Sequence, residues 1–247
     1  MACFTEMISA QPLEARGACI ALLGGGGKTS MLRRLGQEYS EVFPRVLLTS
    51  LTLSARDHGS RVLFLSDLGD AGLAPHFVEH NPVCVMNRAI NEHKLEGVPE
   101  AVVAQLADQA DLCVFECDGA RNLPLKVHND RDPVVPDFAT HVIILVGADA
   151  VDQSLSGGRI HRPERFAEWW GVDPETPLDA AFIAQVVTTR KGYLSKVPER
   201  MQPVYFVNKA DDYPEQAQRL ADAIVRRGIG PVFMGSVVKG VCRRVSR

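Results

Sequence analysis

The sequence lacks the features that mark several common functional classes. It has no basic excess, because 27 Lys and Arg stand against 30 Asp and Glu, a formal net charge of −3. That balance argues against a nucleic-acid-binding protein, which carries surplus cations to meet phosphates. No apolar run approaches the roughly 18 residues of a membrane span, and no basic segment with an apolar block opens the chain. We therefore expect a cytoplasmic protein that binds neither nucleic acid nor membrane.

The sequence also lacks paired cysteines. Six are present, without a C-x-x-C pair or a regular spacing. A zinc site needs short paired spacings, and a disulfide framework would be denser in a chain of this length. We expect six incidental thiols in a reducing compartment. The positions are Cys3, Cys19, Cys84, Cys113, Cys117 and Cys242.

The composition is that of an ordinary globular protein. Hydrophobic residues make up 46% and charged residues 23% of the 247 positions. Short, continuous apolar runs alternate with helical patterns, which predicts a mostly parallel sheet covered by helices on both faces. We predict one domain over residues 1–247, with residues 1–16 a candidate N-terminal extension and loops at 123–137 and 154–164. The predicted strands are 18–23, 46–48, 62–65, 83–86, 112–115, 142–146, 204–207 and 232–234.

A glycine-rich turn lies between the first predicted strand and the first predicted helix. Residues 24–30 read G-G-G-G-K-T-S, and glycines let successive backbone N–H groups turn around phosphate oxygens. The helix N-terminus adds its dipole, an exposed Lys28 would meet the β- and γ-phosphates, and the Thr29 hydroxyl would ligate Mg²⁺. The turn fits the deviant Walker A form, with Leu23 in place of that form's first lysine. The predicted phosphate-binding residues are Gly24, Gly25, Gly26, Gly27, Lys28, Thr29 and Ser30.

Two acids follow the strand predicted at 112–115. Glu116 and Asp118 are two residues apart, so both point to the same side of the strand end. Carboxylates at this edge of a parallel sheet are suited to hold Mg²⁺. We predict that Asp118 binds Mg²⁺ together with Thr29, and that Lys28, Asp118 and Glu116 carry the reaction. The alternative is a solvated strand end.

A third motif, N-K-A-D at residues 208–211, follows a late apolar strand. It matches the N-K-x-D signature of GTP-binding proteins, in which the aspartate accepts hydrogen bonds from guanine N1–H and the exocyclic amine. We therefore predict that Asn208, Lys209 and Asp211 bind the base. In the alternative, Asp211 or Asp212 caps the helix that begins at Pro214.

Several weaker signals accompany these motifs. The hydroxyls of T-S-L-T at residues 49–52 are candidates for a γ-phosphate sensor or for loop caps. Basic residues follow Asp118, and H-R-P-E at 161–164 marks a helix start with Pro163 in its first turn. Trp169 and Trp170 are expected to pack in the core. The roles of Arg121, Lys126, His128 and Arg162 stay open between phosphate or substrate contact and a solvated surface.

Three of these segments, in order, resemble the YqeC family. They are G-G-G-G-K-T-S, then E-C-D-G-A-R-N-L-P-L-K at 116–126, and H-R-P-E after the G-A-D at 147–149. Members of that family are described as accessory proteins for selenium-dependent molybdenum hydroxylases. The resemblance implies a P-loop nucleotide-binding protein that serves maturation or insertion of a selenium- and molybdenum-containing cofactor. Its partner would be a molybdenum hydroxylase or a cofactor-assembly protein.

The fold predicted from the motifs is therefore a three-layer, P-loop NTPase-like α/β fold. The expected activity is Mg²⁺-dependent binding and hydrolysis of GTP or ATP. One rival is a small-molecule kinase or other phosphoryl-transfer enzyme, with Arg121, Lys126 and Arg162 at the acceptor. The other is a non-catalytic, nucleotide-dependent scaffold. The sequence does not distinguish GTP from ATP, nor does it give the partner or the oligomeric state.

Overall fold

A nine-stranded sheet forms the centre of the protein. The computed structural model describes residues 3–9, 17–56, 61–130, 132 and 134–246. In this part of the chain the strand order is β14-β13-β12-β10-β1-β8-β2-β5-β4, and only β14 pairs antiparallel with its neighbour. The strands are β1 Ala18–Gly24, β2 Val46–Ser50, β4 Leu63–Phe64, β5 Val83–Met86, β8 Leu112–Glu116, β10 His141–Gly147, β12 Val204–Asn208, β13 Val232–Ser236 and β14 Val241–Val245.

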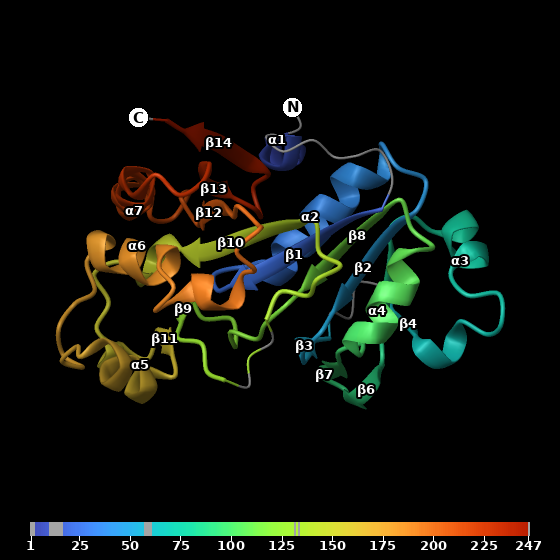
Figure 1. Ribbon diagram of the computed structural model, residues 1–247, viewed down its shortest axis with the longest axis horizontal. Helices are drawn as coiled ribbons and strands as arrows, with labels where there is room; N and C mark the ends of the chain where they lie inside the picture. Colours follow the sequence, from blue (N-terminus) through green and yellow to red (C-terminus); the bar gives the residue numbers. More distant parts are fainter. Residues whose placement is uncertain (1–2, 10–16, 57–60, 131, 133, 247) are drawn as a thin grey trace.

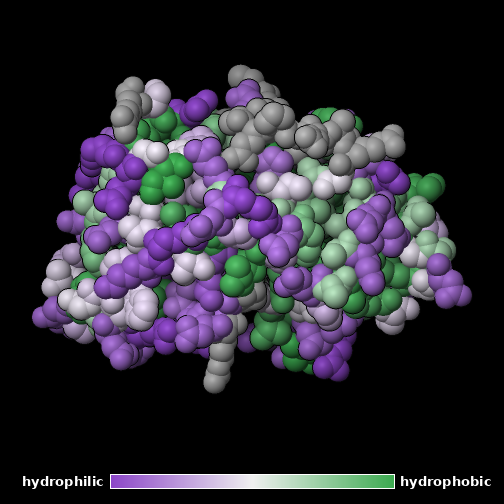
Figure 2. Space-filling view, in the orientation of Figure 1, coloured by the Kyte–Doolittle hydropathy of each residue, from purple (hydrophilic) through white to green (hydrophobic). Residues whose placement is uncertain are grey.

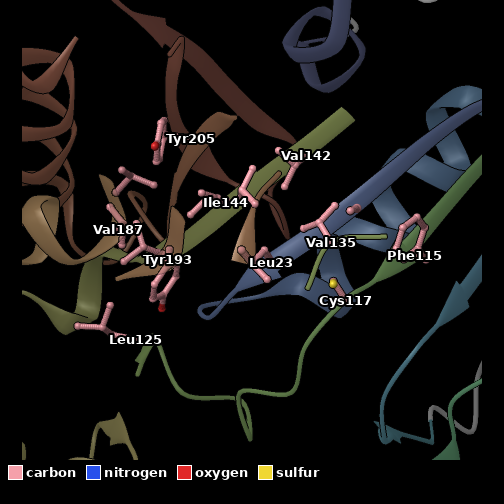
Figure 3. Packing of buried hydrophobic residues seen from close by; sticks show 14 of the residues in the cluster. Leu23, Phe115, Cys117, Leu125, Val135, Val142, Ile144, Val187, Tyr193 and Tyr205 are labelled. Atoms are coloured by element: carbon pink, nitrogen blue, oxygen red, sulfur yellow. The ribbon is translucent and has the colours of Figure 1, made fainter. Parts of the chain in front are cut away.

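Helices cover both faces of this sheet (Figure 1). Strand residues alternate between two hydrophobic cores, so that Ile20 and Leu22 face one core while Ala21 and Leu23 face the other. The first of these cores contains α1 Cys3–Ser9 and α2 Lys28–Ser40. The second core is shown in Figure 3. It contains α3 Ala74–Glu79, α4 Glu100–Ala107, α5 Pro163–Trp170, α6 Ala180–Thr188 and α7 Pro214–Arg227.

Two small sheets and several short turns complete the described structure. One sheet has the order β3-β7-β6, and the other pairs β11 with β9. Their bounds are β3 Ser54–Ala55, β6 Arg88–Asn91, β7 Lys94–Glu96, β9 Leu125–Lys126 and β11 Ile160–His161. The 3₁₀ turns are η1 Leu65–Asp67, η2 Ala148–Ala150, η3 Leu155–Gly157 and η4 Tyr193–Lys196.

The structure confirms the α/β class and the mostly parallel sheet. Each predicted strand is present, although the one expected at 62–65 is shortened to Leu63–Phe64 and runs into a 3₁₀ turn. Helix α7 begins at Pro214, and Gly228 ends it with φ 67°, a left-handed conformation that glycine adopts without strain. Helix α5 begins at Pro163, as the proline predicts.

The two segments predicted as loops meet one another. Leu125 pairs with Ile160 and Lys126 with His161, in a parallel ladder of two residues on each side. Strands β9 and β11 are each too short to show a hydrophobic period, and Pro124 directly precedes β9. The pairing brings residues 125–130 and Asp132 next to residues 160–165, and it thereby builds much of the site described below.

The segment considered as an N-terminal extension contains helix α1. Phe4, Met7 and Ile8 are fully buried, and the Phe4 ring lies 5.6 Å from that of Phe206 on β12. Residues 3–9 therefore belong to the core beside α2, while residues 1–2 and 10–16 lie outside the described part of the chain.

The expectation of six free thiols needs a correction. Cys242 is disulfide-bonded, whereas Cys19, Cys84, Cys113 and Cys117 are free.

Among the residues that the structure describes, no helix is long and apolar enough to cross a bilayer.

Candidate functional site

The glycine turn joins β1 to α2 and leaves a row of backbone donors open. The N–H groups of Gly25 and Gly26 donate to the carbonyls of Leu145 and Leu123, at 3.0 and 2.9 Å. The next four N–H groups, of residues 27–30, have no hydrogen-bond partner in the described chain, and no side chain caps the helix. Unpaired donors at a helix start form a positive site suited to an anion.

The close packing of this turn requires glycine. A Cβ on Gly26 would lie 2.3 Å from the backbone nitrogen of Gly147, and a Cβ on Gly27 would lie 2.5 Å from Nδ2 of Asn208. Gly27 also has φ 120°, which side chains rarely adopt. The four glycines thus have a structural reason to be present whether or not a ligand binds.

Lys28 is buried, which corrects the expectation of an exposed lysine. Only 5% of the residue is accessible, its Nζ lies 3.2 Å from Oδ1 of Asp118, and it donates to the carbonyl of Gly24. An ammonium group has three N–H donors, so these two partners leave one for a ligand. The local sequence around Lys28 does not predict this burial, because Asp118 is ninety positions downstream.

Asp118 is fully buried at the centre of a charged cluster. Besides Lys28, it lies 3.1 Å from Nζ of Lys126 and 2.8 Å from Nε2 of His128, and it accepts from the N–H of Gly24 at 3.0 Å. Burial alone would raise the pKa of Asp118, but Lys28, Lys126 and His128 hold that pKa far below its usual range. The carboxylate is therefore ionised and committed to neighbours within the protein.

The cluster continues to Asp132, which sequence reasoning did not select. Asp132 accepts from Lys126 at 3.0 Å and from Arg162, whose guanidinium also donates to the Val127 carbonyl. Burial raises its pKa, but Arg162 and Lys126 outweigh that effect and lower the pKa to about 2. The β9–β11 pairing sets these contacts, so only knowledge of that pairing would have identified Asp132.

Glu116, not Asp118, is the acid that contacts Thr29. The Thr29 hydroxyl donates to Oε1 of Glu116 at 2.6 Å, and Glu116 itself is 5% exposed. Burial raises the pKa of Glu116, against the opposing effects of Lys28 and Thr29. No cluster of three His, Cys, Asp or Glu suited to a metal exists among the described residues. A cation here would take Thr29 and Glu116 as ligands, with phosphate oxygens and water completing the shell, as Mg²⁺ commonly does.

The N-K-A-D segment lies directly beside the glycine turn. Nδ2 of Asn208 donates to the Gly26 carbonyl at 2.7 Å, and its Oδ1 accepts from the Val237 N–H at 3.0 Å. Lys209 pairs with Asp149 at 2.6 Å. Asp211 is exposed and makes no hydrogen bond or ion pair with any described residue.

The alternative of a helix cap receives no support. Tyr213 occupies the N-cap position of α7, and no side chain caps that helix. Neither Asp211 nor Asp212 therefore serves the helix start, and the Asp211 carboxylate is available to a ligand.

The remaining candidates lie around this centre. Thr49 and Ser50 are buried at the end of β2, where Ser50 is in register with Glu116. Thr49 Oγ1 has no partner in the described chain. It also lines a cavity of about 370 Å³ that Thr29 and Arg33 border. Arg121 is exposed, and no contact fixes its role.

The comparisons with known proteins agree with this chain's motifs. The family model for the YqeC protein matches residues 20–164, more than half of the chain. The chain is also 29% identical over 202 residues to the "Uncharacterized protein YqeC" of Escherichia coli (strain K12). That similarity covers 79% of this chain and 77% of the E. coli protein. The matched range contains the glycine turn and the whole cluster from Glu116 to Arg162.

Proposed function

This chain belongs to the YqeC family, and we propose that it binds Mg²⁺ with a nucleoside triphosphate at the glycine turn and hydrolyses it slowly. The observation that carries the proposal is the row of four open N–H groups at the start of α2. Beside them, Lys28 retains one free donor. A fixed cradle of donors with an adjacent cation is the arrangement that a polyphosphate needs.

The residues of the site have separate parts in this proposal. The open amides and Lys28 offset the charge on the β- and γ-phosphates, which grows as the terminal bond breaks. Asp118 holds Lys28 in place through their 3.2 Å contact and so acts as a positioning residue. Thr29 and Glu116 are the proposed ligands of Mg²⁺, which when bound supplies further positive charge to the phosphates.

The base is proposed to be guanine. Asp211 is exposed and unpaired, three residues after Asn208, which contacts the turn. Two carboxylate oxygens match the two donors of guanine, whereas adenine lacks that pair. Asn208 is proposed to support the turn rather than to touch the base, because both ends of its amide are engaged by backbone groups.

For the cellular role, the family resemblance is the sole support. On that basis we propose that the protein serves the maturation or insertion of a selenium- and molybdenum-containing cofactor in the cytoplasm, with a molybdenum hydroxylase or a cofactor-assembly protein as partner. Of the rival functions, a kinase with Lys126 and Arg162 at the acceptor loses support. Both side chains are already held by Asp118 and Asp132.

Calorimetric titration with GTP, GDP and ATP, each with and without Mg²⁺ and against a buffer blank, tests the proposal. We expect GTP and GDP to bind more tightly than ATP, with Mg²⁺ strengthening the triphosphate more than the diphosphate. Phosphate release without an added acceptor distinguishes hydrolysis from a kinase, and binding without turnover indicates the scaffold. Absence of heat with every nucleotide overturns the proposal.

A further inference from the structure

A second cavity, of about 330 Å³, borders the charged cluster around Asp118. Its walls come from the segment 126–130, from α5 and from the connection between α6 and η4. Lys126 and His128, which contact Asp118, are also lining residues. The volume is at the lower end of the range for small-molecule sites, which suits a ligand of one or two rings.

The cavity is basic. Its lining residues include five cations and one carboxylate, that of Asp130, which is fully exposed. Three of the cations, Lys126, Arg165 and Arg190, each contact a carboxylate. Lys196 is 9% exposed and donates to the backbone carbonyl of Asp132, and neither it nor Lys191 has an acidic partner within 4.0 Å among the described residues. Hydrophilic residues cover much of the face of the molecule shown in Figure 2, with smaller hydrophobic areas between them. The five cations are Lys126, Arg165, Arg190, Lys191 and Lys196.

Two buried polar atoms of the lining residues lack partners. His128 directs Nε2 to Asp118 at 2.8 Å, and burial lowers the pKa of the ring, so the neutral ring donates from Nε2 and keeps an acceptor at Nδ1. That Nδ1 has no partner in the described structure, and neither does Nε1 of Trp170. Because buried polar atoms are nearly always hydrogen-bonded, the residues of this wall hold one acceptor and one donor that the described chain leaves unfilled.

Aromatic side chains also line the cavity. The Tyr193 ring packs edge-on against His128 at 4.6 Å, Lys191 Nζ lies 4.9 Å from the centre of the Trp170 ring, and Trp169 is 50% exposed. The expectation that both tryptophans pack in the core holds only for Trp170, which contacts the larger core. The exposed ring of Trp169 offers a flat surface to another ring.

We propose that this cavity is a second ligand site, which takes a small organic anion with a planar ring. Lys191 and Lys196, which have no acidic partner among the described residues, attract the anionic group, and the aromatic side chains of the wall hold the ring. The site does not depend on a nucleotide at the glycine turn. It provides a place for a second substrate or an effector, connected to Lys28 through Asp118, which contacts both Lys28 and His128.

The protein carries its own reporter for this site, because its two tryptophans are both lining residues. We would titrate the full chain with phenyl phosphate and follow tryptophan fluorescence and calorimetric heat in parallel, without nucleotide. Inorganic phosphate and phenol separate the contributions of the anion and the ring. Phenyl phosphate should bind with a dissociation constant of about 1 mM or lower. Inorganic phosphate and phenol should each bind at least tenfold more weakly.

Variants distinguish the cavity from the glycine turn. Lys191→Glu should weaken phenyl phosphate about tenfold or more, while Lys94→Glu, the same charge change on the distant strand β7, should have no effect. Because both tryptophans line this cavity, the fluorescence response reports binding here rather than at the glycine turn, so a failure of the nucleotide proposal does not affect this test. Equal affinity in Lys191→Glu and the parent chain, or neither quenching nor heat in the parent chain, overturns the proposal.

Discussion

The ends of β8 and β12 carry acids that look equivalent in the sequence and have opposite surroundings in the fold. Asp118 follows β8 and is fully buried among Lys28, Lys126 and His128. Asp211 follows β12 and is exposed, with no partner in the described chain. A buried charge is stable only when it is paired, so Asp118 belongs first to the fold. An exposed, unpaired carboxylate costs the fold nothing and is available to a ligand.

The largest effect on stability should come from neutralising Asp118, the buried acid that follows β8. Asp118→Asn leaves Lys28 and Lys126 without the carboxylate they share, and breaking a buried pair of this kind costs about 3–5 kcal/mol. Urea unfolding should show that loss in the free energy of unfolding. Asp211→Asn, the matched change at the exposed end, should alter it by less than about 0.5 kcal/mol. Equal losses in the two variants would remove the distinction between the ends.

The next effect concerns Lys28, the buried partner of Asp118, and it distinguishes a loss of nucleotide binding from a loss of stability. Lys28→Met keeps the apolar stem and removes the ammonium, and Asp118 retains Lys126 and His128, so we expect a loss of about 1–3 kcal/mol in stability. Triphosphate binding should become undetectable by calorimetry at a temperature where the variant is folded. Unchanged nucleotide affinity in folded Lys28→Met would separate this lysine from the phosphates.

Changing Asp211, the exposed acid that follows β12, should alter the selectivity for the nucleotide base. A site that pairs with the donors of guanine rejects a base without them by up to roughly 10⁴-fold. Asp211→Asn should therefore weaken GTP and improve xanthosine triphosphate, because an amide can donate to the oxygen that replaces the exocyclic amine. A competition assay measures both. Equal or better ATP binding in the parent chain, with no xanthosine gain in the variant, overturns guanine recognition and leaves the phosphate contacts intact.

The last effect concerns the pH dependence of stability, and it involves His161, which pairs in register with Lys126. Burial lowers the pKa of His161 from 6.5 to about 4, and the nearby charges of Lys126 and Arg162 add to the shift. Between these values the unfolded chain binds the proton and the folded chain does not. Stability therefore falls as the pH drops from 6.5 to about 4. His161→Gln should flatten the dependence of the urea midpoint on pH in this window, with exposed His93→Gln as the control. A parallel loss in His161→Gln and the parent chain contradicts the assignment.

The sequence predicts the central sheet well because each buried strand carries a continuous apolar run, as at Ala18–Gly24 and His141–Gly147. It also predicts which loops stand at the sheet edge. It does not predict contacts between distant loops, since the two-residue ladder of β9 and β11 has no period of its own. The burial of Lys28, the pairing of Thr29 with Glu116 and the role of Asp132 depend on such contacts.

The most direct test of the triphosphate site is the backbone amide spectrum of the ¹⁵N-labelled chain. Adding Mg²⁺ with a slowly hydrolysed GTP analogue should shift the amide signals of Gly27, Lys28, Thr29 and Ser30 most strongly, because these N–H groups are open. The signals of Gly25 and Gly26 should move less, because their N–H groups already donate to carbonyls. Saturating analogue that leaves all four signals in place, or that shifts only residues elsewhere, would contradict the account.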